Sequence, residues 1–309
     1  MYLNKSGYKI LVTGADGQLG RELHSIASMY PDYQCVFATK AALEITNIDL
    51  LRNYLRETHF DIIINCAAYT AVDEAEKQSD LANRVNHLAV RNLAEIAESL
   101  EITLVHISCN YVFDGYSDKP YFETSTTSPK TVYGKTKLNG ENAIIHSKTK
   151  GIIIRTAWLY SHNENNFVTT VLKKASNNRV IQAISDQIGT PSYAKDLAEA
   201  IFSIIKSKNF TEVTSLPEIF HYSSKGIASW YDFAKAICEI SNLNCTVKPI
   251  DSFALNTLEN RPPYSVLSHK KIIETFGLSI PHWRDSLTLC LYYIKNIERN
   301  FLEMTYVTG

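Results

Sequence analysis

The chain has 309 residues, of which 45% are hydrophobic, so it can bury a full core as one large α/β unit or as a nucleotide domain with a smaller partner. Lys and Arg number 31 against 32 Asp and Glu, and no basic run could neutralise a row of phosphates. This composition argues against a nucleic-acid-binding protein and favours a small-molecule partner.

The first half of the chain alternates short apolar strands with helical patterns. Strands are expected at residues 9–13, 35–37, 61–65, 103–107 and 151–155. A first helix carries Leu19, Leu23, Ile26 and Ala27 on one face, and further helices are expected at residues 48–57, 81–100 and 133–145. This alternation is typical of an α/β fold with a Rossmann-type, doubly wound parallel sheet.

The pattern becomes irregular beyond residue 160. Short strands are expected at residues 180–184, 220–223 and 246–250, among helices at 231–240 and 283–297. We expect residues 1–160, with parts of 190–222, to form the nucleotide-binding domain. Residues 161–309 would form mainly a smaller carboxyl-terminal α/β domain for the substrate.

The cysteines and the amino-terminal residues bear on where in the cell the protein is located. The six cysteines are scattered singly, without the pairs or the density of a small secreted scaffold. Residues 1–8 lack the apolar core of a signal peptide, and no apolar run approaches membrane-spanning length. We expect free thiols, a cytoplasmic location and no membrane partner.

A glycine-rich segment, residues 13–20, lies between the first strand and the first helix, where a pyrophosphate meets the positive end of the helix. Gly14 would permit a tight turn, Gly17 would let the backbone approach phosphate, and Gly20 would let the helix pack close to the sheet. A plain glycine turn is the alternative. The candidate cofactor-binding residues here are Gly14, Gly17, Gln18, Leu19 and Gly20.

The end of the second strand bears on the choice of cofactor. NAD-binding folds usually carry an acidic residue there, which binds the ribose 2'-hydroxyl. This chain has Thr39 and Lys40 instead, which favours NADP(H) with NADH as the alternative. An ordinary solvated lysine is the competing interpretation of Lys40.

Small residues follow the third strand, at the edge where open α/β sheets bind ligands. Ala67, Ala68 and Tyr69 are the cofactor candidates in this segment, and they would let a dinucleotide lie flat. Close helix packing is the alternative explanation. Asn86, in the following helix, is a weaker candidate.

Tyr133 and Lys137 stand four residues apart, one turn along a common helix face. A carbonyl that accepts hydride on carbon must accept a proton on oxygen, and a tyrosine can donate it. A nearby ammonium lowers a phenol pKa by about 1 to 3 units, so we expect Lys137 to activate Tyr133 and also to bind ribose hydroxyls. Alone the pair is a weak motif, but after a nucleotide-binding half it is strong.

The chain resembles the extended short-chain dehydrogenase/reductase family, and within it the dTDP-4-dehydrorhamnose reductases. The likeness covers nearly the whole chain and includes, besides the two motifs above, residues 65–76, 111–115, 155–160, 186–191, 229–230 and 261–267. It implies that NADPH reduces the 4-keto group of dTDP-4-dehydro-L-rhamnose to give dTDP-L-rhamnose. It also implies that Tyr133 is the proton donor and that a dTDP-sugar is the binding partner. A homodimer is the assembly that it suggests.

The resemblance also implies substrate-binding residues. Trp158 offers an apolar plate for a sugar or base, and Arg261 offers a fork that matches diphosphate oxygens. A core tryptophan and a surface ion-pairing arginine are the competing interpretations. The substrate-binding candidates are Asn110, Tyr111, Trp158, Gln187 and Arg261.

The chain departs from the family at the third member of its catalytic triad. Where the family has Ser-Thr-Asp, this chain has Ser108, Cys109 and Asn110. Cys109 is kept as a catalytic candidate by position, although a thiol is a weaker donor than a hydroxyl. The departure leaves a non-catalytic NADP-binding regulatory subunit open as an alternative, beside another nucleotide-sugar reductase or epimerase. No carboxylate cluster has recognisable ligand spacing, so no metal is predicted.

Overall fold

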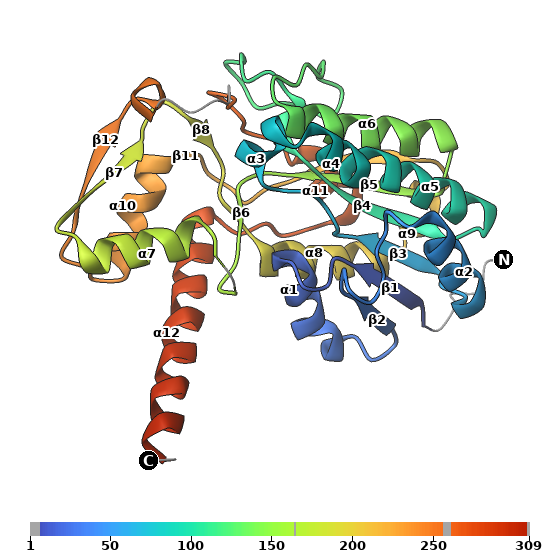
Figure 1. The fold of residues 1–309 in the computed structure, drawn as a ribbon, viewed down its shortest axis with the longest axis horizontal. Coiled ribbons are helices and arrows are strands. Elements are labelled where there is room, and N and C mark those ends of the chain that lie inside the picture. The colour runs from blue at the N-terminus through green and yellow to red at the C-terminus, as the bar shows by residue number, and fades with distance from the viewer. Residues whose placement is uncertain (1–6, 164, 256–260, 308–309) are drawn as a thin grey trace.

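The computed structural model describes residues 7–163, 165–255 and 261–307 (Figure 1). Residues 1–6, on which most of the signal-peptide prediction depends, lie outside the described residues. Within the described part of the chain, no helix combines the length and the apolar character that crossing a bilayer requires.

A six-stranded sheet forms the centre of the molecule. Its strands are β1 (Lys9–Thr13), β2 (Gln34–Ala38), β3 (Ile62–Asn65), β4 (Thr103–Cys109), β5 (Gly151–Thr156) and β10 (Glu218–Tyr222). They lie in the order β10-β5-β4-β3-β1-β2, and every neighbouring pair is parallel. The predicted doubly wound parallel sheet is confirmed. The strand order reverses between β1 and β3, and ligands bind at such a switch point, outside the carboxyl ends of the strands.

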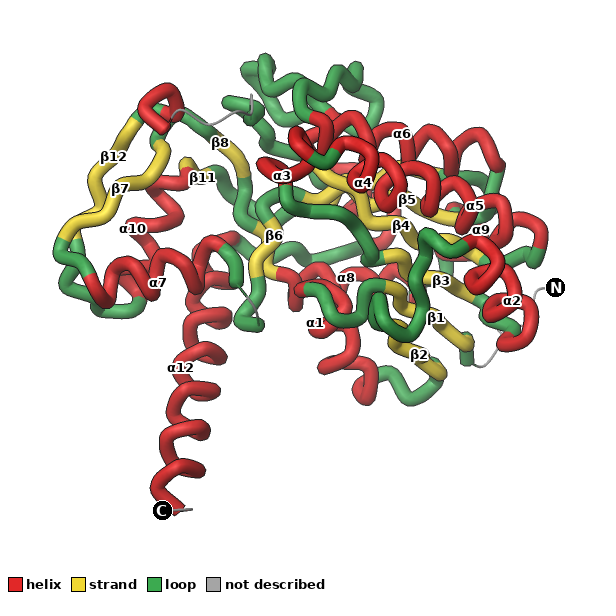
Figure 2. Tube along the Cα trace, in the orientation of Figure 1, coloured by secondary structure: helices red, strands yellow, loops and turns green. Residues whose placement is uncertain are grey.

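Helices cover both faces of this sheet, as Figure 2 shows. Ile10 of β1 packs with α1 and α8 on one face, whereas its neighbour Leu11 packs with α2, α5 and α6 on the other. Successive strand residues point to opposite faces, which is why β1 is apolar throughout. The helical elements of this part are α1 (Gln18–Ile26), η1 (Ala27–Met29), α2 (Ile48–Thr58), α3 (Val72–Lys77), α4 (Ser79–Asn83), η2 (Arg84–Leu88), α5 (Ala89–Ser99), η3 (Asn110–Val112), α6 (Val132–Ser147), α8 (Ala194–Lys206), α9 (Phe210–Val213) and α11 (Lys270–Phe276).

A second core lies beside the sheet, in the carboxyl-terminal half. Tyr160, Phe233 and Leu287 belong to it, and the long helix α12 runs away from it in Figure 1. Short strands pair here as β6 with β9, β8 with β11 and β7 with β12. The elements of this half are β6 (Leu159–Tyr160), α7 (Phe167–Asn177), β7 (Val180–Ile184), β8 (Ile188–Gly189), β9 (Ser192–Tyr193), β11 (Ala228–Ser229), α10 (Trp230–Ile240), β12 (Thr246–Ile250), η4 (Ser252–Leu255) and α12 (Trp283–Val307).

One predicted helix differs in the structure. Residues 81–100 are divided into the end of α4, the π-helical turn η2 and α5. Asn86 in η2 accepts a hydrogen bond from Tyr69 N (2.8 Å) and donates to Tyr69 O (3.1 Å) and to Thr136 Oγ1 (3.2 Å). Single π turns inside helices frequently lie at functional sites. Here the widened turn accompanies contacts to distant residues, which local periodicity does not encode.

Candidate active site

The glycine-rich loop runs directly from β1 into α1. Gly14 has a φ of 65°, and a Cβ added there would lie 2.7 Å from the Ala67 nitrogen, so a larger residue would be strained. A Cβ added at Gly20 would lie 2.6 Å from Ala15 Cα. Gly20 therefore lets α1 pack closely against the loop that directly follows β1.

The first turn of α1 faces a cavity. Gly17, at the N-cap, makes no side-chain cap, and Gln18 and Leu19 line the cavity beside it. Gln18 Oε1 is buried without a hydrogen-bond partner in the described part of the chain. Because an uncapped helix start presents backbone N–H groups and a positive dipole end, this loop fits the pyrophosphate of a dinucleotide.

Two further groups of predicted cofactor residues lie around this loop. Of the three residues predicted after β3, Ala68 lines the cavity, Ala67 packs its backbone on Gly14, and Tyr69 is held by Asn86. The structure thus gives one of the three a direct place in the cavity wall.

Thr39 and Lys40 follow β2, whose Ala38 carbonyl accepts a hydrogen bond from Ala15 N in the loop (3.1 Å). Neither is among the residues that line the cavity. The Lys40 ammonium is exposed and lies 3.6 Å from the Glu44 carboxylate. Their role in binding a 2'-phosphate therefore stays a prediction.

The start of α6 brings Tyr133 and Lys137 into the same cavity. Thr131 caps this helix by accepting a hydrogen bond from Gly134 N (3.0 Å). Lys137 is 2% exposed, and its Nζ donates to the Ile107 carbonyl of β4 (2.6 Å). The lysine is therefore fixed against the sheet, and its ammonium is not free to swing.

Cys109, the last residue of β4, completes this group. Its thiol is hydrogen-bonded with the Tyr133 hydroxyl, and the side chain is buried. Burial raises the pKa of the Cys109 thiol to about 11, so the thiol keeps its proton at neutral pH. The structure thus brings the three predicted catalytic residues together.

The expected effect of Lys137 on Tyr133 is wrong in this arrangement. Burial raises the pKa of the Tyr133 phenol well above its ordinary value, and the adjacent Cys109 adds to the rise. Burial also lowers the pKa of Lys137, against the opposing influence of Cys109, Glu141 and Cys66. Desolvation is the largest influence on each of the two groups. Tyr133 is therefore held in its neutral form, which is the form that donates a proton.

A buried ion pair between α6 and β5 lies next to this site. The Arg155 guanidinium of β5 donates to both oxygens of Glu141, with Nε–Oε1 and Nη2–Oε2 distances of 2.9 and 2.6 Å. Ser108, next to Cys109, also donates to Glu141. Glu141 lies one turn after Lys137 on the same face of α6. The sequence analysis missed it, although this spacing was the available signal.

Stacked aromatic rings form another wall of the cavity. Trp158 lies parallel to Trp230 with ring centroids 3.6 Å apart, and Phe167 lies 4.6 Å from Trp230. Trp158 has a φ of 46°, in the left-handed region, and its ring covers Gly189, where a Cβ would lie 2.5 Å from the indole. This wall offers a flat apolar surface for a sugar ring or a base.

The other predicted substrate residues have different positions. Asn110 and Tyr111 line the cavity, and the Tyr111 ring meets Tyr133 edge-on at 5.6 Å. Arg261 also lines it, with Nη2 2.5 Å from Asp73 Oδ1. Gln187 is buried and is not among the lining residues, so its contact with the substrate stays a prediction.

Both halves of the chain thus enclose one cavity of about 500 Å³. The lining residues that the sequence analysis did not name as site candidates are Cys66, Thr70, Val72, Ile107, Ser108, Thr156, Ala157, Leu159, Tyr160, Asn165, Asn166, Phe167, Trp230 and Phe233. The sequence carried a signal for two of these segments. Asn166 and Ser229 each form a capping box, and the helices that they begin start at the lining residues Phe167 and Trp230. Among the described residues, no group of three or more His, Cys, Asp or Glu side chains is arranged to hold a metal ion.

Comparison with known proteins identifies the family. The sequence pattern of the family described as RmlD substrate binding domain matches residues 8–295. The chain belongs to the RmlD family.

Individual relatives agree with the RmlD assignment. The spore coat polysaccharide biosynthesis protein SpsK of Bacillus subtilis is 39% identical over 90% of this chain and 95% of its own length. A dTDP-4-dehydrorhamnose reductase of Aggregatibacter actinomycetemcomitans is 36% identical over 90% of this chain and 97% of its own. The solved structure of a Bacillus anthracis dTDP-4-dehydrorhamnose reductase in complex with NADP has a TM-score of 0.87, 34% identity, and coverage of 93% and 99%.

The resemblance drawn from the sequence is therefore confirmed at the level of the RmlD family and of its reductases. The residues of this chain also suit a nicotinamide dinucleotide. Gly14 and Gly20 allow the tight loop, Gly17 lines the cavity without a side chain, and Gln18 leaves a buried polar atom beside it.

Proposed function

We propose that this chain reduces the 4-keto group of dTDP-4-dehydro-L-rhamnose to give dTDP-L-rhamnose. One observation carries the proposal: the glycine-rich loop, Tyr133 and the Trp158 wall line the same cavity. A reductase needs a dinucleotide site, a proton donor and a sugar site within reach of one another. NADPH supplies the hydride when it is bound at the loop, with NADH as the alternative donor.

Tyr133 acts as the general acid. Its raised pKa keeps the phenol protonated at neutral pH, so the hydroxyl can give its proton to the 4-oxygen as negative charge develops there. Lys137, fixed by the Ile107 carbonyl, presents its ammonium beside the donor and is the candidate ligand for ribose hydroxyls. Cys109, whose thiol contacts the Tyr133 hydroxyl, would orient that hydroxyl toward the substrate.

The remaining roles follow from position. We assign residues 1–160 and parts of 190–222 to NADPH binding, because α8 and β10 belong to the central sheet assembly. Residues 161–309 would mainly hold the sugar nucleotide. Trp158 and Arg261 are the proposed contacts for the sugar and the diphosphate, since a flat ring and a guanidinium fork suit those groups.

We also propose a cytoplasmic location, which the six free cysteines support. A homodimer stays a prediction, which sedimentation of the full chain would test.

The deciding experiment follows loss of nicotinamide absorbance with dTDP-4-dehydro-L-rhamnose and either NADPH or NADH. We expect wild-type turnover and a loss of at least about 100-fold in kcat for Tyr133→Phe, because that variant has no proton to donate. Tyr116→Phe is the matched control, since Tyr116 is 78% exposed, and it should retain wild-type kcat.

The alternatives make different predictions. A non-catalytic regulatory subunit, which the Cys109 substitution keeps open, would bind NADPH without turnover in wild type. A reductase for another nucleotide-sugar would turn over only when the sugar is changed. Equal activity of wild type and Tyr133→Phe would reject the assignment of Tyr133.

A further inference from the structure

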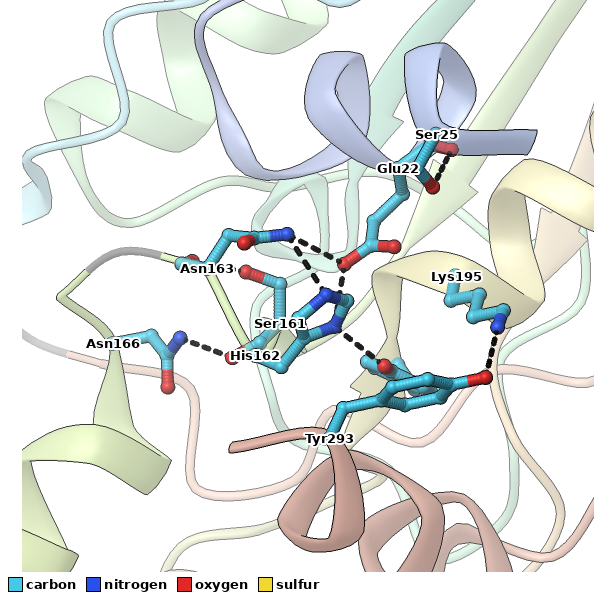
Figure 3. Close-up of polar contacts among 9 residues, drawn as sticks. Glu22, Ser25, Ser161, His162, Asn163, Asn166, Lys195 and Tyr293 are labelled. Atoms are coloured by element: carbon cyan, nitrogen blue, oxygen red, sulfur yellow. Dashed lines mark hydrogen bonds and ion pairs between the residues drawn. The ribbon is translucent and has the colours of Figure 1, made fainter. Parts of the chain in front are cut away.

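A buried polar cluster lies behind the cavity, between the dinucleotide-binding helix and the carboxyl-terminal half (Figure 3). Glu22 of α1, one turn after Gln18, is 0% exposed. Its Oε1 lies 3.1 Å from His162 Nδ1 and 3.4 Å from Asn163 Nδ2. Glu22 Oε2 is buried without a partner among the described residues. A carboxylate thus stands where α1 otherwise packs with apolar residues.

Such a carboxylate is a poor source of stability. Taking a charged group out of water costs several kcal/mol, and a partner recovers that cost only with good geometry. Apolar residues of similar volume usually serve a core at least as well, whereas buried polar groups in some proteins fix one arrangement of neighbouring elements. The Glu22 contacts therefore point to placement of the residues that it touches.

His162 connects α1 to two other elements. Its Nδ1 lies 2.7 Å from the Tyr193 hydroxyl of β9, and its ring stacks on Tyr293 of α12 with centroids 5.2 Å apart. Lys195 of α8 donates to the Tyr293 hydroxyl (2.7 Å). Figure 3 shows Glu22 and Asn163 on one side of the imidazole and Tyr293 on the other, with Lys195 at the Tyr293 hydroxyl. His162 therefore sits at the meeting point of the two halves of the molecule.

The chain that carries His162 continues into the cavity wall. Asn166 Nδ2 donates to the Ser161 carbonyl (2.7 Å), and Asn166 Oδ1 accepts from Val168 N (2.9 Å) at the start of α7. Asn165, Asn166 and Phe167 line the cavity on the side of the aromatic wall. A shift of His162 would consequently move this wall relative to the glycine-rich loop.

We propose that Glu22 and His162 form a positioning pair that couples the dinucleotide-binding helix α1 to the substrate wall at Asn165, Asn166 and Phe167. The pair transmits the position of α1 to that wall through Asn163 and the Ser161 carbonyl. Order imposed on α1 by a dinucleotide is thereby passed to the sugar-nucleotide side, and the effect is reciprocal. This proposal depends on the proposed use of NADP(H) and a dTDP-sugar.

The test measures coupling between two binding events and needs no turnover. The affinity of the full chain for dTDP is determined by titration calorimetry with and without saturating NADP⁺. We expect dTDP to bind at least about fivefold more tightly to the wild type when NADP⁺ is present. Failure of the proposed reaction would appear separately, as absent turnover with the coupling intact.

Two variants remove the link. Glu22→Gln keeps the side-chain volume, and His162→Phe keeps a ring beside Tyr293 while it loses the polar contacts to Glu22, Tyr193 and Asn163. In each we expect the fivefold coupling to fall to nearly onefold, with NADP⁺ affinity alone changed by less than about twofold. Asn163→Ala is the further variant if His162→Phe does not fold, and its coupling should fall as well.

Lys195→Met is the matched control. It breaks the Lys195–Tyr293 hydrogen bond in the same cluster but leaves the path from Glu22 to Asn163 intact, so wild-type coupling is expected. A merely structural role would lower the melting temperature of Glu22→Gln and leave its coupling unchanged, which would overturn the proposal. Independent binding of dTDP and NADP⁺ in the wild type would overturn it too.

Discussion

The Cys109 thiol is hydrogen-bonded with the Tyr133 hydroxyl at the carboxyl end of β4. The cysteine thus occupies the place that a hydroxyl residue has in the resembling family. It contacts the proposed proton donor directly, so we expect its chemistry to affect the rate of the proposed reaction.

Restoring a hydroxyl at this position should speed the reaction. An O–H group is a stronger and shorter hydrogen-bond donor than a thiol, so Cys109→Thr should raise kcat by about 5- to 10-fold. Steady-state kinetics at saturating NADPH would measure it, with Cys245→Thr, outside the cavity lining, as the control. An unchanged or lower kcat in a folded Cys109→Thr protein would contradict a direct role of this side chain.

Glu141→Gln should be costly for stability. The variant leaves the buried Arg155 guanidinium without its counter-charge, and breaking one partner of such a pair costs about 3 to 5 kcal/mol in the free energy of unfolding. Glu239→Gln is the comparison, because its pair with Arg284 is half exposed and should contribute less than about 1 kcal/mol. Denaturant unfolding of both variants gives the two values, and equal losses would show that the Glu141 pair is not special.

Gly20 should respond differently from Gly17. A Cβ at Gly20 would collide with the loop backbone, so Gly20→Ala should lower both stability and NADPH affinity. The Cβ of Gly17→Ala would lie 3.4 Å from Gly14 O, an ordinary contact, so the free energy of unfolding should change by less than about 0.5 kcal/mol. NADPH affinity of Gly17→Ala should nevertheless fall, because the methyl group intrudes on the phosphate. Melting curves and fluorescence titration separate the two effects.

Asp196 should make the protein less stable as pH rises through the mildly acidic range. Burial raises the pKa of this carboxyl from 3.8 to about 6, partly opposed by the hydrogen bond from Ser286. Between these values the folded state holds a proton that the unfolded chain has lost, so stability falls as pH increases. Relative to wild type, Asp196→Asn should therefore gain roughly 1 to 3 kcal/mol between about pH 4 and pH 7.

Ser286→Ala provides a second arm of that experiment. Loss of the hydrogen bond from Ser286 should raise the pKa of Asp196 further, so stability should keep falling to a higher pH than in the wild type. A difference between Asp196→Asn and wild type that does not vary with pH would contradict the assignment.

Local patterns predicted most of the longer strands. The bounds of β1, β7 and β12 match the expected strands, since short apolar or β-rich runs end at turn residues. The glycine loop and the Tyr133–Lys137 pair were visible for the same reason, because each depends on spacing within one element.

Features that depend on distant contacts were missed. The π turn at Asn86 occurs where this side chain hydrogen-bonds with the Tyr69 backbone. Glu141 of α6 is important because it pairs with Arg155 of β5. The pKa of Tyr133 was expected to fall beside Lys137, yet burial raises it. Burial and cross-chain pairing are products of the tertiary fold, which residue spacing alone does not report.

Trp158 and Trp230 are two of the three tryptophans in the chain, and both line the cavity. Indoles stacked at 3.6 Å share their electronic excitations, so this pair should produce a paired positive and negative band in circular dichroism. A ligand that slides against or between the rings would alter that signal without any label. The enzyme therefore contains its own optical reporter, placed where its substrate is expected to arrive.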